Sequence, residues 1–548
     1  MAKFRSLLAK AQTYFFVFAL VFSACRAPEK INQNEIAPQS YEESFDIPPP
    51  SINLAKPLEI SQKPEDLELS KKIDEIIEKS EFANARWGVF VVSLKDGRVL
   101  VAKDARKLFN PASIQKILTT IIALDKLGAD FRWKTWVFSQ NQIEPDGSLN
   151  GDLTLYGEGA PDFDEAGIEN LANQLQAKGL KQVKGGIVGD ESFFKGDNLG
   201  DGWTWNDLQW YYGAEASALT FKENQAAIYM QDGKPVASTD YIALSGELKP
   251  LEKEQIKAAG LQRGLGDNQF YFWGNGDEVY GRVAVHDAPL WAAKELKKAL
   301  EKKGIMVAKD ARSANWKSEN KLNVETAIEF AVAESQTLAE VVQRMNKRSI
   351  NLYAELILRT IGKKFGSEAP AEEARMKELR GDDAAGTAVI KKWLKEKNVA
   401  ADEIQIHDGS GLSRLDFITP EVFGRALIYA TQAKFADVFK NSLPISGTDG
   451  TLGGRLWKEK EKGKILAKTG SITYVNSLAG YANKFAEESL DKGAGKNTEK
   501  ITEKPSDETF AFVIICNNQT RRSESTNIID AIAASLVGSL DTEEKSKK

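Results

Sequence analysis

The chain has 548 residues, of which 42% are hydrophobic and 28% are charged. This composition is that of an ordinary soluble globular protein, and the length allows two or three domains with a sizeable core. The formal net charge is only −5, and Lys and Arg are spread along the chain rather than clustered. We therefore expect no nucleic acid partner.

Residues 1–24 have the features of a secretory signal peptide. Three cationic residues precede an apolar stretch that is too short to span a membrane. An uncleaved anchor is the alternative. The stretch ends in "FSAC", which resembles a bacterial lipobox in which Cys25 carries the lipid, although Phe22 stands where Leu is usual. These residues predict export to the bacterial cell envelope, in the periplasm, with a lipid anchor in a membrane.

A tether is expected after the signal peptide. Residues 25–65 are rich in Pro, Asn, Ser and Glu and show no periodicity, which predicts a disordered segment behind the lipidated Cys25. The only other cysteine, Cys516, lies in the apolar run "FAFVIICNN". This run predicts a buried strand, where a free thiol is inert. We expect no disulfide, so the fold must depend on its core.

A sheet and its first helices are predicted after the tether. A helical pattern begins at Leu67, and two apolar strands then flank Asp96-Gly97, which is a hairpin signal. The helix that follows has Pro111 in its first turn and Gly128 at its end.

The C-terminal part completes this pattern. "GKILAKTGSITYVNSLAGYANKFA" predicts two strands, "TFAFVIICNN" a third, and "STNIIDAIAASLVGSL" a closing helix. Between the last two strands, a polar stretch that begins "EESLDKGAG" predicts a long exposed loop. Five strands with terminal helices and one central helix predict an α/β fold of the α+β type, in which helices sandwich an antiparallel sheet.

The middle of the chain has a different sequence pattern. In residues 129–329, short strand-like runs alternate with glycines, which predicts a large, mostly β insertion of one or two domains. Helical patterns then resume. The main domain is therefore expected to consist of residues 66–128 and 330–540, followed by a polar tail at 541–548.

Ser113 and Lys116 form the first candidate for catalysis. The chain has four Ser-x-x-Lys patterns where roughly two or three are expected by chance, so the pattern alone is weak. Only this pair lies at a helix start with an apolar helix behind it. The two side chains then share one helix face, near backbone N–H groups that favour an oxyanion. An amine in an apolar site can lose its proton and accept one from the serine. The alternative is a polar pair on a helix face.

Two further patterns follow in order. Ser349 and Asn351 form a Ser-x-Asn pattern within a helical region, but this pattern is common and also begins at Ser313 and Ser318, for example. Lys468-Thr469-Gly470 occurs once, on a predicted strand, and its glycine would let a substrate backbone approach closely. The order Ser-x-x-Lys, Ser-x-Asn and Lys-Thr-Gly, in helix, helix and strand, matches the set shared by penicillin-binding proteins and class A β-lactamases.

Six stretches together resemble one family more closely. They are "FNPASIQKILTT", "YYGAEASAL", "MNKRSINLYAELILR", "HDGSGLSR", "LPISGTDGTL" and "AKTGS". The chain resembles the D-alanyl-D-alanine carboxypeptidase/endopeptidase family, the class C low-molecular-mass penicillin-binding proteins, over about residues 66–540. Ile350 stands where Asp or Asn is commoner, and Gly157 to Asp164 is a looser version of a Gly-Asp-Pro stretch of the family. The resemblance implies a β-lactamase/transpeptidase-like fold for the main domain.

The resemblance also implies roles for the catalytic residues. Ser113 would be the nucleophile and Lys116 its base, while Ser349 and Asn351 would relay protons and orient the substrate amide. A serine-type D-Ala-D-Ala carboxypeptidase, or DD-endopeptidase, would hydrolyse peptidoglycan stem peptides or cross-links through an acyl-enzyme. β-Lactams would act as inhibitors, and no metal or organic cofactor is implied.

A substrate-binding set follows from the same resemblance. Lys468 and Thr469 would receive the terminal carboxylate of the substrate beside Gly470. The backbone N–H groups of Ser113 and Ser471 would form the oxyanion hole.

Other functions remain as alternatives. A β-lactamase would use the same acyl-enzyme and release it quickly, and a non-enzymatic cell-wall-binding lipoprotein would have damaged patterns, whereas all three are intact. His407 beside Asp408 suggests a Ser-His-Asp triad, but "DGSGL" lacks the Gly-x-Ser-x-Gly elbow. The sequence has no His-x-x-x-His or Cys cluster for a metal.

Overall fold

The computed structural model describes residues 51–249, 260–274, 279–319, 321–368, 381–400, 404–485, 505–521 and 525–538. These residues belong to two compact units, a smaller one at Ala226–Val283 and a larger one that comprises Ile47–Gln225 and Ala284–Lys548. The predicted signal peptide, Cys25, the tether up to residue 50, the polar stretch at 486–504 and the tail at 541–548 lie outside the described residues.

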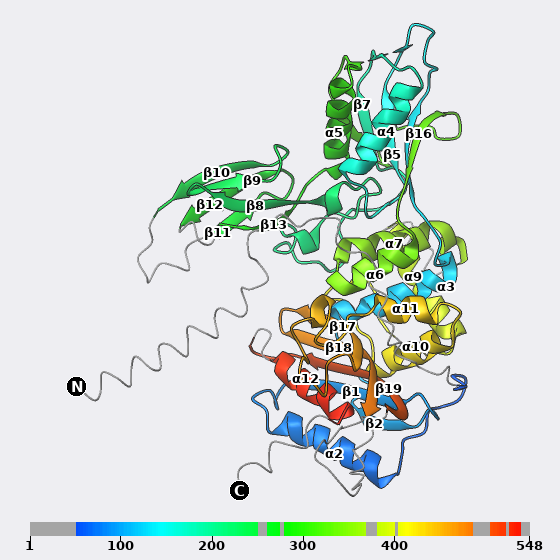
Figure 1. Cartoon of the computed structure of the whole chain (residues 1–548), viewed down its shortest axis with the longest axis vertical. Coiled ribbons are helices and arrows are strands. Elements are labelled where there is room, and N and C mark those ends of the chain that lie inside the picture. Colours follow the sequence, from blue (N-terminus) through cyan, green and yellow to red (C-terminus); the bar gives the residue numbers. More distant parts are fainter. Residues whose placement is uncertain are drawn as a thin grey trace, which may run out of the picture. The chain divides into compact units, whose positions relative to one another are not determined.

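The larger unit contains a five-stranded antiparallel sheet (Figure 1). Its strand order is β17-β18-β19-β1-β2, so the two ends of the chain pair in the middle of the sheet, between β1 and β19. The strands are β1 (Arg86–Ser93), β2 (Val99–Lys103), β17 (Ile465–Ile472), β18 (Val475–Phe485) and β19 (Pro505–Asn517). The predicted hairpin, the five strands and the antiparallel sheet are confirmed.

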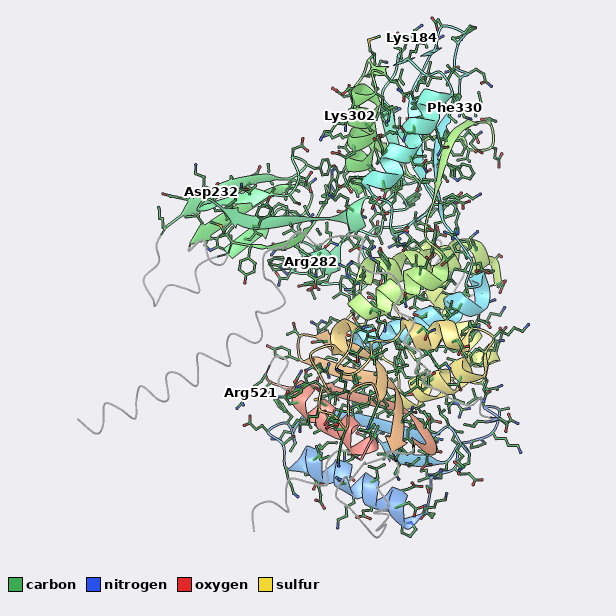
Figure 2. The ribbon with its side chains drawn as sticks, viewed as in Figure 1. Lys184, Asp232, Arg282, Lys302, Phe330 and Arg521 are labelled. Carbon is green, nitrogen blue, oxygen red and sulfur yellow. The ribbon has the colours of Figure 1, made fainter. Side chains whose placement is uncertain are left out.

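Helices cover both faces of this sheet (Figure 2). Seven consecutive residues of β1 are buried, because a strand between two layers has no solvent-facing side. One face packs against the two terminal helices, α2 (Pro64–Glu78) and α12 (Ser525–Leu536), in a shared hydrophobic core. The other face packs against α10 (Pro420–Gln432), where Gly424 lies against the ring of Phe90.

A layer of helices surrounds α3 (Gln115–Leu127), the predicted central helix. Residues 115–124 of α3 are all buried, and Gly128 ends the helix with a φ of 83°. The neighbouring helices are α6 (Leu338–Arg348), α7 (Asn351–Phe365), α9 (Asp382–Glu396), α10 and α11 (Ala436–Ser442). Short 3₁₀ turns lie at η1 (Ala112–Ile114), η2 (Tyr211–Gly213), η3 (Lys222–Asn224), η6 (Gly366–Glu368) and η7 (Gly450–Leu452). Among the described helices, none combines the length and apolarity needed to cross a membrane.

The expected insertion contains a second five-stranded sheet, with strand order β15-β7-β5-β3-β16. Its strands are β3 (Lys134–Ser139), β5 (Leu153–Gly157), β7 (Ile187–Asp190), β15 (Arg312–Ala314) and β16 (Ile328–Glu334). A short sheet of β14 (Met306–Val307), β6 (Gln182–Val183) and β4 (Ser148–Leu149) lies in the same part of the chain. Two helices that the sequence did not reveal, α4 (Glu165–Ala177) and α5 (Ala288–Lys302), pack on the larger sheet.

The connection between β5 and β7 explains why helix α4 is present. Strands β5 and β7 are parallel, and parallel neighbours need a long crossover connection, which α4 supplies. Asp164 caps this helix by accepting hydrogen bonds from the backbone N–H groups of Ala166 (2.9 Å) and Gly167 (3.3 Å). Asp164 therefore has a structural role within the stretch that departs from the family pattern.

The smaller unit consists of two three-stranded sheets, with strand orders β10-β12-β11 and β13-β8-β9. The strands are β8 (Gln225–Gln231), β9 (Lys234–Ala237), β10 (Ala243–Leu248), β11 (Gly260–Arg263), β12 (Gln269–Gly274) and β13 (Gly281–Ala284).

The end of the predicted tether is packed against the larger unit. Leu54 is buried, and its carbonyl accepts a hydrogen bond from Arg425. Ile60 forms a bridge with Val99 at the end of β2. Residues 51–63 therefore differ from the expected disordered segment, because Leu54 is buried and the backbone of Glu59 and Ser61 is hydrogen-bonded to that of Val99.

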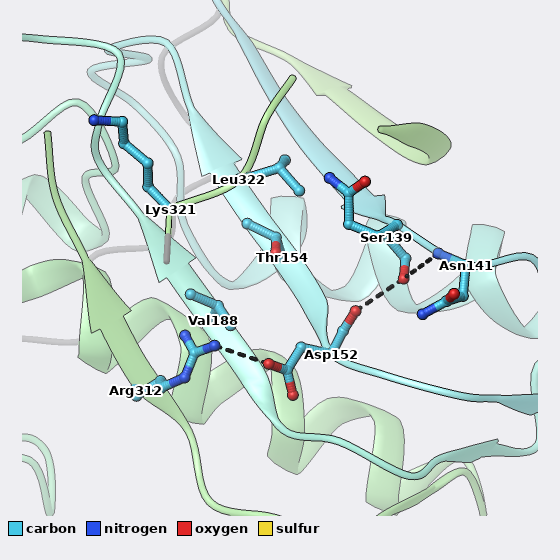
Figure 3. Close-up of a pocket in the computed structure, with 9 residues that line it drawn as sticks. Ser139, Asn141, Asp152, Thr154, Val188, Arg312, Lys321 and Leu322 are labelled. Atoms are coloured by element: carbon cyan, nitrogen blue, oxygen red, sulfur yellow. Dashed lines mark hydrogen bonds and ion pairs between the residues drawn. The ribbon is translucent and has the colours of Figure 1, made fainter. Parts of the chain in front are cut away.

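A polar pocket of about 270 Å³ lies on the insertion's larger sheet (Figure 3). Inside it, Asp152 accepts hydrogen bonds from Arg312 (2.8 Å) through its carboxylate and from Ser139 (3.0 Å) through its carbonyl. None of the predicted site residues lines this pocket. The lining residues are Ser139, Gln140, Asn141, Asp152, Thr154, Val188, Arg312, Lys321 and Leu322.

Candidate active site

Ser113 lies at the junction between the turn that follows β2 and helix α3. It is the middle residue of η1, and the preceding residue, Ala112, has a φ of 50°. A positive φ is unfavourable for a residue with a Cβ atom, and such strain is typical of functional sites. Gly411 supports the turn from outside, because a Cβ atom there would lie 1.9 Å from the carbonyl oxygen of Ala112.

Lys116 lies completely buried beside Ser113. Its Nζ donates hydrogen bonds to Ser113 Oγ (3.0 Å), Asn351 Oδ1 (2.7 Å) and the backbone carbonyl of Ser410 (2.7 Å). Burial lowers the pKa of Lys116 to about 7, against the opposing effect of Asp408 and Glu355, whose negative charge would raise it. The amine is thus neutral in a substantial fraction of molecules near neutral pH.

The Ser-x-Asn pattern lies at a break between two helices. We expected it within a helical region, but α6 ends at Arg348 and Ser349 adopts the left-handed conformation, with a φ of 57°. Ile350 is extended, and Asn351 begins α7. This break turns the two side chains of the pattern toward the lysines: Asn351 Oδ1 contacts Lys116 Nζ, and Asn351 Nδ2 donates to the carbonyl of Tyr212 (2.9 Å).

The Lys-Thr-Gly pattern lies on β17, the edge strand of the main sheet. Lys468 is fully buried, and its Nζ donates to Ser349 Oγ and to the carbonyl of Thr469, both at 2.8 Å. Burial, followed by the positive charges of Lys116 and Arg455, lowers the pKa of Lys468 well below its ordinary value. Thr469 Oγ1 is within hydrogen-bond distance of Thr451 Oγ1 (2.8 Å).

Gly470 lies where β17 passes the nucleophile turn. A Cβ atom at this position would lie 2.1 Å from Ser477 Oγ and 3.0 Å from both the carbonyl oxygen of Pro111 and the backbone nitrogen of Ser113. Ser477 Oγ itself donates to the Pro111 carbonyl (2.7 Å) and so ties β18 to the same turn. The next residue, Ser471, is exposed. The predicted strand residues and Ser113 therefore lie side by side.

The sequence did not reveal several residues that hold this arrangement. Asn517, at the end of β19, exchanges two hydrogen bonds with the backbone of Asn110, at 2.8 and 3.0 Å. The side chain of Asn110 donates to the carbonyl of Ser413 (2.9 Å) and accepts from the N–H of Ala112 (3.1 Å). The sequence pointed to them only indirectly, because Asn110 and Ser413 lie within two of the six stretches that resemble the family, "FNPASIQKILTT" and "HDGSGLSR".

The rival Ser-His-Asp triad is not assembled. The imidazole of His407 pairs with Asp201 (2.9 Å). The carboxylate of Asp408 instead accepts hydrogen bonds from Ser410, Gly411, Ser413 and Trp203. Within the described part of the chain, no group of three or more His, Cys, Asp or Glu side chains could hold a metal ion.

With this geometry established, comparison with known proteins identifies the family. A sequence profile of the D-Ala-D-Ala carboxypeptidase 3 (S13) family matches residues 69–537. The chain belongs to this family. The predicted resemblance is therefore confirmed, and so is the prediction of a serine-type D-alanyl-D-alanine carboxypeptidase or endopeptidase.

Individual proteins that are similar to this chain support its assignment to the S13 family. A D-alanyl-D-alanine carboxypeptidase from Actinomadura sp. (strain R39) is 27% identical over 442 residues, which cover 76% of this chain and 78% of that protein. A second one, from Haemophilus influenzae, is 23% identical over 72% of this chain and 81% of its own length. The crystal structure of penicillin binding protein 4 from H. influenzae matches with a TM-score of 0.69 and 22% identity, over 85% of this chain and 98% of that one. This likeness confirms the predicted fold class.

Gly470→Ala tests the close approach of β17 to the nucleophile turn. The new methyl group would displace Ser477 Oγ and press on the backbone at Ser113. We expect a loss of about 1–3 kcal/mol in the free energy of unfolding and a slower acylation by β-lactams. Gly454→Ala is the matched control, because no atom lies within 4 Å of a Cβ there. Urea unfolding and acylation rates check both variants, and equal behaviour of the two would contradict the packing argument.

Proposed function

We propose that Ser113 is the nucleophile of this S13 peptidase and that Lys116 is its general base. The observation that carries the proposal is the convergence of all three patterns. Lys116 Nζ lies 3.0 Å from Ser113 Oγ and 2.7 Å from Asn351 Oδ1, and Lys468 Nζ lies 2.8 Å from Ser349 Oγ. Residues far apart in the sequence thus form two neighbouring hydrogen-bonded groups, one around Lys116 and one around Lys468.

Acylation follows from these contacts. The neutral amine of Lys116 takes the proton of Ser113, whose Oγ attacks the carbonyl carbon of the penultimate D-Ala of a stem peptide. The backbone N–H groups of Ser113 and Ser471 stabilise the oxyanion. The C–N bond to the leaving group then breaks, and its amine receives a proton from Ser349, which is replaced from Lys468. Water attacks the resulting ester and gives its proton to the Lys468–Ser349 pair, while Lys116 returns the first proton to Ser113 Oγ as the acyl group leaves.

Substrate selection depends on the strand residues. Lys468 and Thr469 bind the terminal carboxylate, and Gly470 lets the peptide backbone lie along β17. Asn351 orients the scissile amide while its other end remains bonded to Tyr212. β-Lactams carry a strained amide and a carboxylate in a similar arrangement, and a structure of penicillin binding protein 4 from H. influenzae, with a TM-score of 0.64, was solved with a β-lactam.

We also propose the organisation and location that the sequence predicts. The peptidase domain comprises residues 66–128 and 330–540, and residues 129–329 are inserted into it. Export to the periplasm and lipidation of Cys25 would place the enzyme beside its peptidoglycan substrate. The "FSAC" stretch supports this location.

The first test is covalent trapping. Brief exposure to penicillin should add one β-lactam to the tryptic peptide that contains Ser113, and the adduct should outlast that of a β-lactamase. Ser113→Ala should remove it, because this change deletes the hydroxyl that contacts Lys116 Nζ. Peptide mass spectrometry is the measurement. An adduct on another serine, or one that persists in Ser113→Ala, would show that the nucleophile is misassigned.

The second test separates a proton acceptor from a fixed positive charge at position 116. Arg cannot become neutral, because its pKa stays above about 12. Lys116→Arg should therefore lose acylation almost as completely as Lys116→Ala, by at least the ~10²-fold that general-base catalysis contributes. Lys126→Arg, on the same helix, is the matched control. The second-order rate of β-lactam acylation is measured after circular dichroism has confirmed folding. If Lys116→Arg keeps more than about a tenth of the wild-type rate, worth ~1.4 kcal/mol, another group is the base.

The third test concerns the anchor. Diacylation of Cys25 provides two chains, which is enough for stable membrane association. Cys25→Ala should move the protein from the membrane to the soluble fraction or block its maturation. Cys516→Ala, which changes the same residue type inside the sheet, should leave fractionation unaltered. Immunoblots of separated membranes report the result, and an unchanged distribution of Cys25→Ala would rule out the lipid anchor.

A further inference from the structure

Three buried carboxyl groups lie behind Lys116, and the proposed mechanism gives none of them a role. Glu355 is on α7, while Asp408 and Asp416 are in the segment between α9 and α10. At most 1% of each residue is exposed. An uncompensated buried carboxylate is costly, so the protonation state of each group has consequences for the lysine beside them.

Asp408 is held by four hydrogen bonds. Its carboxylate accepts hydrogen bonds from the backbone N–H groups of Gly411 (2.7 Å) and Ser413 (2.8 Å), from the indole of Trp203 (2.9 Å) and from Ser410 Oγ (3.1 Å). These four donors satisfy both oxygens of the carboxylate. The same bonds fold the turn at residues 408–413, which presents the carbonyl of Ser410 to Lys116 Nζ.

The other two carboxyl groups are surrounded differently. Burial, and then the charge of Asp408, raises the pKa of Glu355 to about 8 and raises the pKa of Asp416 well above its ordinary range. Asp416 accepts a hydrogen bond from the backbone N–H of His407 (2.7 Å), and Glu355 accepts one from that of Gly409 (3.1 Å). Asp408, with four donors, is the most fully hydrogen-bonded of the three carboxyl groups.

Lys116 is subject to charges from each element packed around it. These groups are Lys468 on β17, Glu355 and Arg359 on α7, and Asp408 and Asp416 in the segment between α9 and α10. Lys468 disfavours the protonated form of Lys116, and Asp408 favours it. The base is thus held between a cation on the substrate side and an anion behind it.

We propose that Asp408 is a positioning residue for Lys116, which both folds the turn that holds the amine and supplies the negative charge that sets its protonation. This inference rests on the proposed role of Lys116 as general base. Glu355 and Asp416 are the further buried carboxyl groups beside it.

The test compares isosteric amide variants by their pH profiles. Wild type, Asp408→Asn and Asp416→Asn are assayed for the second-order rate of acylation by a β-lactam from pH 5 to 9. Asp408→Asn removes the negative charge, so protonated Lys116 becomes less stable. We expect the midpoint of the acid limb to fall by roughly one pH unit, together with a lower plateau because the turn is perturbed. Asp416→Asn leaves Asp408 and its four donors in place and keeps the hydrogen bond from the His407 N–H, so its midpoint should stay at the wild-type value.

Trp203→Phe provides a second variant that does not remove the buried acid. Trp203→Phe deletes one hydrogen-bond donor to the Asp408 carboxylate and keeps the carboxylate itself. With one donor fewer, the carboxylate stabilises protonated Lys116 more strongly, so the midpoint of the acid limb should rise by a few tenths of a pH unit. This opposite sign keeps the inference testable even if Asp408→Asn does not fold. If Asp408→Asn folds and its midpoint does not move, Asp408 has only a structural role. If Asp408→Asn does not fold, an unchanged midpoint in Trp203→Phe leads to the same conclusion. A wild type that is not acylated at Ser113 would instead refute the proposed function.

Discussion

The desolvation of Lys116 is the constraint on which the rest of the site depends. An amine that is removed from water favours its neutral form, and a neutral amine next to a hydroxyl can act as a base. The fold achieves this by surrounding α3 with helices on one side and the main sheet on the other. The cost of burying the group is offset by three acceptors, namely Ser113 Oγ, Asn351 Oδ1 and the carbonyl of Ser410. Each acceptor comes from a different part of the chain, so the site exists only in the complete fold.

Backbone strain and the insertion both help to assemble these partners. Ala112 and Ser349 adopt positive φ angles, and each is held by its neighbours, since Gly411 leaves room for the Ala112 carbonyl and Lys468 binds the Ser349 hydroxyl. The proposed insertion contributes the Tyr212 carbonyl, which binds Asn351. A further contact joins Glu223 to Arg344 (2.6 Å), on the helix that leads to Ser349. Two residues of the proposed insertion thus help to hold the Ser-x-Asn pattern and the helix before it.

Much of the main sheet and the site could be predicted from the sequence because the signals are local. The hairpin at Asp96-Gly97 and the apolar runs define strands, and the order of three short patterns identifies the catalytic set. The break at Ser349 was missed because a strained non-glycine residue has no sequence signature and is stabilised by Lys468, 119 residues away. Helix α4 was missed because the crossover that requires it depends on parallel pairing of β5 and β7, a tertiary fact. The sequence connected Asp408 only with a Ser-His-Asp triad that was rejected, because His407 is its neighbour, whereas its actual donors are set by a turn.

The two buried lysines, in the proposed roles, also explain why a substrate should end in a carboxylate. Burial, followed by the positive charges of Lys116 and Arg455, lowers the pKa of Lys468, so a protonated Lys468 is costly without a counter-charge. The terminal carboxylate of a stem peptide would supply that counter-charge, on the side where Thr469 is only partly buried. A ligand without the carboxylate would leave the charge uncompensated and would bind less well. Substrate recognition and base activation are therefore consequences of one electrostatic balance.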